Sequence, residues 1–100
     1  MLTNIKQDLI TLRDELYFYS LVHLSKQQIA EYELIETAIN LMFTLAEEKH
    51  VYLSKYDRAL VMTDEDATEI YNAIINYLKY LSKDNHFISN DTGISHYLTA

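Results

Sequence analysis

The chain has 100 residues, which is the size of a single domain, and it contains no cysteine. A disulfide scaffold, a cysteine-ligated zinc module and an iron–sulfur protein are therefore excluded. Its 8 lysines and arginines stand against 15 aspartates and glutamates, a net charge of -7. We expect no direct nucleic-acid binding, because phosphate recognition needs clustered cations.

The first predicted helix spans residues 3–23. Its apolar positions are three or four residues apart, which places them on one helix face, close to the pattern of a coiled-coil seam. They are Leu2, Ile5, Leu9, Leu12, Leu16 and Tyr19. The segment from Leu16 to Val22 is apolar nearly all round, so we expect it to be packed on more than one side. His23 continues the stripe and is expected to be a hydrogen-bonded residue at or near the core.

The second predicted helix spans residues 26–49. Ser25 and Gln28 have the spacing of a capping box at its start. Polar and apolar residues again alternate at spacings of three and four. The polar face contains Glu33, Glu36, Asn40, Thr44 and Glu47, and the apolar face contains Ile35, Ala38, Met42 and Leu45.

A short helix is predicted for residues 55–62. Ser54 and Asp57 could cap it, although the segment VYLSKY also has the composition of a strand. We favour the helix, because a strand would have no partner in an otherwise helical chain.

The third long helix is predicted for residues 64–83. Thr63 is placed to cap it, and Asp64, Glu65 and Asp66 follow at the positive end of the helix dipole. Lys79 and Lys83 lie at the opposite, negative end, so both charge patterns favour a helix here.

Together these elements predict an all-α fold, a compact bundle of three long helices and one short helix. We assign the bundle to residues 1–86 and a C-terminal tail to residues 87–100. The tail is expected either to dock on the bundle through Phe87, Ile88 and Tyr97 or to remain flexible.

A metal site is the sharpest chemical alternative. Glu47 and His50 form an E-x-x-H pattern, which places a carboxylate and an imidazole on one helix face, as in carboxylate-bridged di-iron bundles. Those bundles need two such motifs, and this chain has one unless a dimer supplies the second. His86 and His96 flank a loop and could chelate a metal, but no spacing rule fixes their geometry. We therefore expect no metal and no cofactor.

Catalytic motifs are equally weak. The serines lack the context of a known nucleophile, and a single glycine excludes a glycine-rich phosphate loop. Asp91, Thr92 and Gly93 match the short string of aspartic proteases, yet that chemistry belongs to a β-rich framework. An ordinary turn explains the same residues. We expect no enzymatic activity.

The unusual features are acidity and a content of nine tyrosines. They favour a non-catalytic protein-binding domain that masks a basic surface, as an inhibitor, an immunity-like or antitoxin-like protein, or an adaptor. Tyrosine is favoured at interfaces because it joins a large apolar face to a hydroxyl. The candidate partner-binding residues are Glu33, Glu36, Glu65, Asp66 and Glu69, with Tyr32 and Tyr56 as anchors. Equally, Tyr17, Tyr71 and Tyr77 could pack in the core while the charge serves solubility alone.

Two other functions remain open on the sequence. One is a structural or regulatory homodimer, which the near-heptad stripe of the first helix permits. The other is a metal-binding bundle that uses Glu47 and His50. We expect a cytoplasmic protein without a membrane span, because no secretory signal is visible and uncharged stretches are much shorter than the roughly 20 apolar residues of a span.

Overall fold

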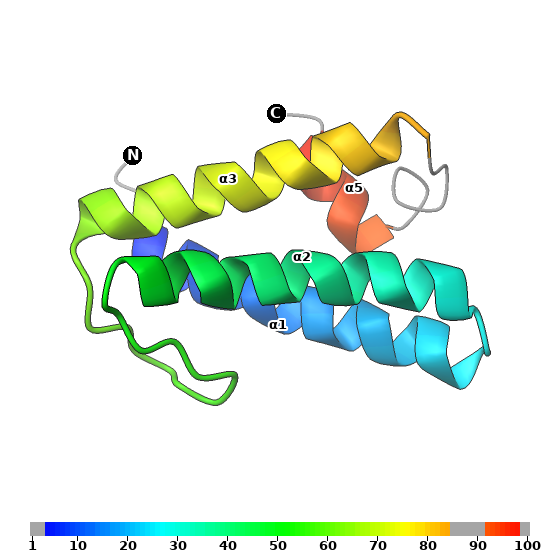
Figure 1. Ribbon diagram of the computed structural model, residues 1–100, viewed down its shortest axis with the longest axis horizontal. Coiled ribbons are helices and arrows are strands. Elements are labelled where there is room, and N and C mark those ends of the chain that lie inside the picture. Colours follow the sequence, from blue (N-terminus) through cyan, green and yellow to red (C-terminus); the bar gives the residue numbers. More distant parts are fainter. Residues whose placement is uncertain (1–3, 85–91, 99–100) are drawn as a thin grey trace.

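The computed structural model describes residues 4–84 and 92–98, and folds them into four helices (Figure 1). They are α1 (Ile5–Ser25), α2 (Ile29–Glu48), α3 (Asp64–Ser82) and the short α5 (Thr92–Leu98). The long helices run up, down and up along the bundle, and α5 turns back against α3 and α1. The all-α class with three long helices and one short helix is confirmed for the described residues.

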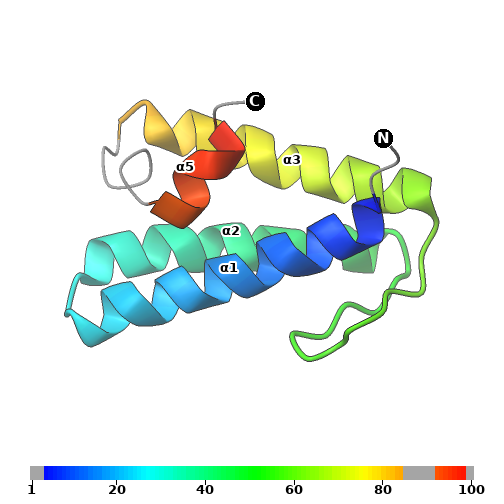
Figure 2. The same ribbon diagram turned by 180° about the vertical axis from the view of Figure 1, so that it is seen from behind.

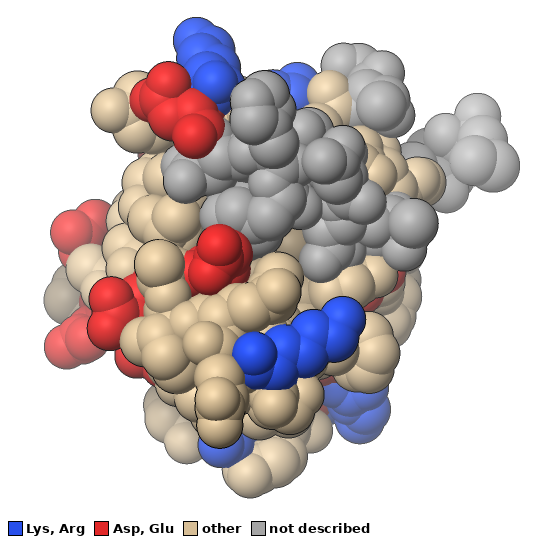
Figure 3. Space-filling model, turned by 90° about the vertical axis from the view of Figure 1, so that its right-hand side faces the viewer, with Lys and Arg blue, Asp and Glu red and all other residues tan. Residues whose placement is uncertain are grey.

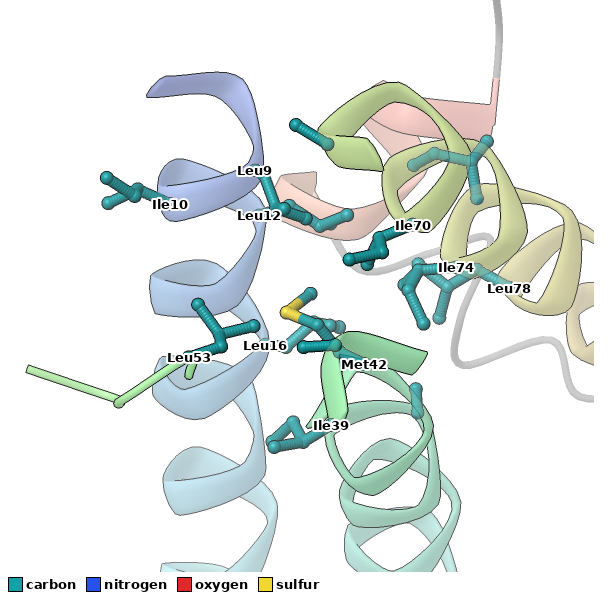
Figure 4. Packing of buried hydrophobic residues seen from close by; sticks show 14 of the residues in the cluster. Leu9, Ile10, Leu12, Leu16, Ile39, Met42, Leu53, Ile70, Ile74 and Leu78 are labelled. Atoms are coloured by element: carbon teal, nitrogen blue, oxygen red, sulfur yellow. The ribbon is translucent and has the colours of Figure 1, made fainter. Parts of the chain in front are cut away.

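The apolar stripe of α1 forms the centre of the bundle. Leu9, Leu12 and Leu16 are fully buried, and Figure 4 shows Leu12 beside Ile70 of α3 and Leu16 beside Met42 of α2. The near-heptad spacing therefore serves packing within the chain, since these side chains have no exposed surface left for a second copy. The remaining buried apolar residues of the long helices are Ile10, Ile35, Ala38, Ile39, Ala46, Ala67, Ile74, Ile75, Leu78 and Leu81.

The connection between α1 and α2 differs from the predicted capping box. Ser25 is still part of α1, and its hydroxyl donates to a carbonyl of the preceding turn. Gln28 precedes α2 without a side-chain cap, because its amide oxygen lies 2.7 Å from Nδ1 of His23. Gln27 has a φ of 59°, the left-handed conformation that reverses the chain. The second helix consequently begins at residue 29, three residues later than predicted, while the near-core position of His23 is confirmed.

Thr63 caps α3 as predicted. Its hydroxyl accepts a hydrogen bond from the backbone N–H of Asp66 at 3.1 Å, and α3 ends at Ser82, one residue before the predicted boundary. This cap satisfies one of the free amides at the helix start, beside the acids that favour the positive end of the dipole.

The helix predicted for residues 55–62 is wrong. Residues 49–63 form a loop that lies along the first half of α1 (Figure 2) and buries Leu53, Leu60 and Met62. Two carbonyls that such a helix would use, those of Ser54 and Asp57, instead accept hydrogen bonds from the guanidinium of Arg13. One hydrogen bond of the predicted cap does form, because the Ser54 N–H donates to the Asp57 carboxylate. No helix follows it.

The one short helix of the described residues is α5, near the C-terminus. Ile94 is buried against the bundle, and the ring of Tyr97 lies edge-on to that of Tyr71, with centroids 6.3 Å apart. The Tyr97 hydroxyl lies close enough to the Glu15 carboxylate of α1 for that carboxylate to raise the pKa of Tyr97. Phe87 and Ile88, the other predicted docking residues, lie outside the described residues.

Alkaline pH is expected to loosen α5. Burial, followed by the nearby Glu15 carboxylate, raises the pKa of Tyr97 above its ordinary value of 10.0. A raised pKa in the folded state means that the neutral hydroxyl contributes stability below pH 10.0, and that this contribution is lost as pH rises through the folded pKa. Tyrosinate absorbance and amide exchange in α5 should change together above pH 10.0. Tyr97→Phe should remove that coupling. The prediction is contradicted if the protection of the α5 amides, corrected for the intrinsic pH dependence of amide exchange, stays constant above pH 10.0.

Candidate partner-binding site

The residues predicted to bind a partner lie at separate places on the molecule. Glu65, Asp66 and Glu69 are in the first turns of α3, at the left of Figure 1, whereas Glu33, Glu36 and Tyr32 are in the first half of α2, which begins at the right. Tyr56 lies in the loop before α3. Figure 3 views the end where α1 turns into α2, and there uncharged surface separates the acidic side chain near the centre from those gathered at the left edge. The predicted set is not one continuous surface.

The acids of α3 converge on a lysine that follows α2. The ammonium of Lys49 is 3.6 Å from a carboxylate oxygen of Asp66 and also hydrogen bonds to Glu69. The bond to Glu69 is the main reason that the pKa of Lys49 is raised, because it stabilises the charged ammonium. The two carboxylates are thus close enough together to hold one cation between α2 and α3.

A groove runs beside this lysine, with a volume of about 340 Å³. Leu45, Ile70 and Ala73 supply its apolar lining, while Glu48, Lys49 and Glu69 supply charged side chains. Ile70 is fully buried and Glu48 and Glu69 are exposed, so the groove has an apolar floor and a charged rim. We call this region, with the first turn of α3, the acidic groove.

Carboxylates outnumber cations around the acidic groove. Lys49 is engaged as described, and Lys6 lies 3.8 Å from Asp64. Within the described chain, Glu47, Glu48 and Glu65 form no ion pair. The carboxylates of this end are Glu47, Glu48, Asp64, Glu65, Asp66 and Glu69. The region therefore keeps a negative excess after its internal pairs are formed.

The acids of α2 have a different setting. Glu33 is exposed, and Glu36 accepts a hydrogen bond from the Tyr32 hydroxyl, which raises the pKa of Tyr32. Tyr32 is thereby oriented by its own helix, one turn away from its partner. These residues adjoin the packing of α1 on α2 and do not border the acidic groove.

A second surface was not predicted. Phe18 and Leu21 of α1 are 60% and 61% exposed, and Tyr56 of the loop is 76% exposed. With Asp14, Tyr17 and Lys55 they line an open hollow of about 410 Å³, which we call the aromatic hollow. The prediction that the second half of α1 is packed on more than one side is wrong for this face. A sequence that is apolar all round gives no sign of which side is left uncovered.

The geometry required for the E-x-x-H pattern is absent from this structure. Glu47 is in the last turn of α2, whereas His50 lies past the end of the helix with a φ of 58°. The two side chains therefore do not share a helical face. Groups of three or more histidine, aspartate or glutamate side chains placed to hold a metal do not occur in residues 4–84 and 92–98. His86 and Asp91 are outside those ranges, and Thr92 begins α5.

The described helices include none with the length and apolar character needed to cross a bilayer. Comparison of the chain with protein-family models, with curated proteins and with solved structures finds no match in any of the three.

Proposed function

We propose that this protein is a non-catalytic binding domain whose acidic groove holds a basic segment of a partner protein. The observation that carries the proposal is Lys49, whose ammonium lies between Asp66 and Glu69 beside an apolar floor. It is an internal example of how the groove accommodates a long cationic side chain. A lysine or arginine of a partner could lay its aliphatic stem on the same floor.

The two parts of the groove have different roles in this proposal. Exposed ion pairs contribute only about 0.2 to 1 kcal/mol each, so Glu48 and Glu65 would not by themselves hold a partner tightly. Their excess charge speeds encounter with a basic surface and rejects an acidic one. Affinity comes mainly from apolar contact with Leu45 and Ala73, the partly exposed apolar residues of the lining.

Masking is the mode of action that fits this arrangement. A domain that occupies a basic surface acts as an inhibitor, as an immunity-like or antitoxin-like protein, or as an adaptor, and needs no catalytic group of its own. The proposal retains Glu65, Asp66 and Glu69 from the predicted set and adds Glu48. It leaves the acids of the first half of α2 outside the groove.

Charge reversal on the groove rim is expected to weaken binding of a basic probe. The probe is a synthetic amphipathic helix of leucine and lysine, and its control carries glutamate in place of lysine. Glu48→Lys combined with Glu65→Lys should raise the Kd of the lysine peptide about tenfold or more, since attraction becomes repulsion. Isothermal titration calorimetry measures the change.

The matched control is Glu33→Lys. It makes the same charge change as Glu48→Lys alone, on the same helix and about 22 Å from Glu48 at about 1.5 Å per residue. Its effect on the Kd should be small at physiological salt, where the Debye length is about 8 Å. Equal weakening by Glu33→Lys, or equal binding of the glutamate peptide, would contradict the proposal.

A further inference from the structure

We infer that two copies of this chain associate through the aromatic hollow, related by a two-fold axis. This interaction surface is separate from the acidic groove. It is built from Phe18 and Leu21 of α1 and from Tyr56 of the loop, which are the large apolar side chains that line the hollow and are more than half exposed.

The shape of the surface is suited to pairing with itself. Phe18 and Leu21, three residues apart on α1, project beside an open hollow of about 410 Å³. A two-fold interface brings the same patch of each copy together, so a projection must meet a depression of the same surface. Here both lie within one patch, and an aromatic ring is the kind of anchor that fills such a depression.

The loop side of the hollow is held firmly before any association. Arg13 is fully buried, and its guanidinium donates to the Asp57 carbonyl at 2.8 Å as well as to that of Ser54. The ammonium of Lys55 lies 5.7 Å from the ring centre of Tyr17 and 5.2 Å from that of Tyr56. Such preorganisation lowers the entropic cost of forming an interface.

The charges select a second copy as the occupant. Cations and carboxylates are balanced around the hollow, whereas the whole chain carries -7. Among the residues that line the hollow, Lys55 and Asp14 are the charged ones, one of each sign. At the acidic groove, two copies would bring carboxylates against carboxylates. The hollow is a neutral face that carries both signs, which is the condition for charge complementarity between identical surfaces.

Lys55 is the cation of this face that is available for an ion pair between two copies. It forms no ion pair within the part of the chain that the structure describes. In contrast, Asp14 accepts hydrogen bonds from both Arg13 and Arg58. Across a two-fold axis, Lys55 of each copy is available to a carboxylate of the other copy.

Sedimentation equilibrium over micromolar to millimolar concentrations tests this inference on the whole chain. We expect the mass to rise from that of a monomer to that of a dimer. Phe18→Glu should raise the dimer Kd at least about 30-fold, the effect of losing one interface hot spot. Circular dichroism should show an unchanged fold, because an exposed side chain is replaced.

Two matched controls locate the interface. Tyr80→Glu places the same acid at a position of α3 that is 63% exposed, and should leave the dimer Kd unchanged. Lys55→Glu should weaken the dimer, whereas Lys83→Glu makes the same charge change at the end of α3 and should not. A protein that stays monomeric at every concentration overturns the inference. A dimer that resists Phe18→Glu, or that Tyr80→Glu weakens equally, overturns it as well.

Discussion

Replacing Arg13 with methionine is expected to lower the free energy of unfolding by about 3 kcal/mol. Arg13 is fully buried, and its guanidinium is the hydrogen-bond donor for the backbone carbonyls of Ser54 and Asp57. Methionine fills much of the space of the arginine stem but donates nothing. Each of these part-buried carbonyls, left without its donor, costs about 1 to 3 kcal/mol. Urea denaturation followed by circular dichroism measures the loss.

The control for this prediction is Arg58→Met. Arg58 contacts the same carboxylate, Asp14, yet its side chain is 66% exposed. We expect its removal to cost less than about 1 kcal/mol, because exposed ion pairs contribute little. Hydrogen exchange should also show faster opening of residues 51–62 in the Arg13 variant alone. Equal destabilisation by the two variants would mean that the buried guanidinium does not hold the loop.

The second large effect is expected from Leu16→Ala, which should lower the free energy of unfolding by about 2 to 5 kcal/mol. Leu16 is fully buried at the centre of the bundle, so truncation removes apolar contacts and leaves a cavity. Leu21 lies on the same helix and is 61% exposed, and Leu21→Ala should change stability by no more than about 0.5 kcal/mol. Thermal and urea unfolding of dilute, monomeric protein measures both.

This pair of leucines also separates two interpretations of α1. If the near-heptad stripe were an outward coiled-coil seam, Leu16→Ala would disrupt association and spare the monomer. In this fold Leu16 stabilises the monomer, because it is buried, whereas Leu21 lies on the exposed face and is the leucine that could contribute to association. A Leu16→Ala variant with wild-type stability at low concentration would contradict the packing shown in Figure 4.

The long helices could be predicted because their information is local. Spacings of three and four residues identified the buried face of α1, and the Thr63 hydroxyl with the acids after it identified the start of α3. The loop of residues 49–63 could not be predicted in this way. Its conformation depends on Arg13, which is 41 and 44 residues away from the two carbonyls that it binds. A single arginine beside an apolar stripe gives no local sign that it will be fully buried.

The candidate surfaces were predictable in part, for the same reason. The excess of acids in α3 is visible in the sequence. The pairing of Lys49 with Asp66 and Glu69, however, requires the end of α2 to lie beside the start of α3. The exposure of Phe18 and Leu21 was missed because periodicity shows which residues share a face, not which face remains uncovered.

The two proposed surfaces do not share residues, so both can act in one molecule. Association through the aromatic hollow would leave the acidic groove of each copy open. A dimer would then present two grooves, and a partner with two basic segments would bind it more tightly than it binds a monomer. The gain depends on whether the partner can reach both grooves at once.

The central claim, that the acidic groove receives a basic segment, is tested most directly by NMR titration of the isotope-labelled protein with the leucine–lysine peptide. We expect shift changes to concentrate in the amides of residues 45–50 and 64–73 and to weaken as salt is added. Changes concentrated on the first half of α2 or around Tyr56, or changes that salt leaves unaltered, would contradict the claim.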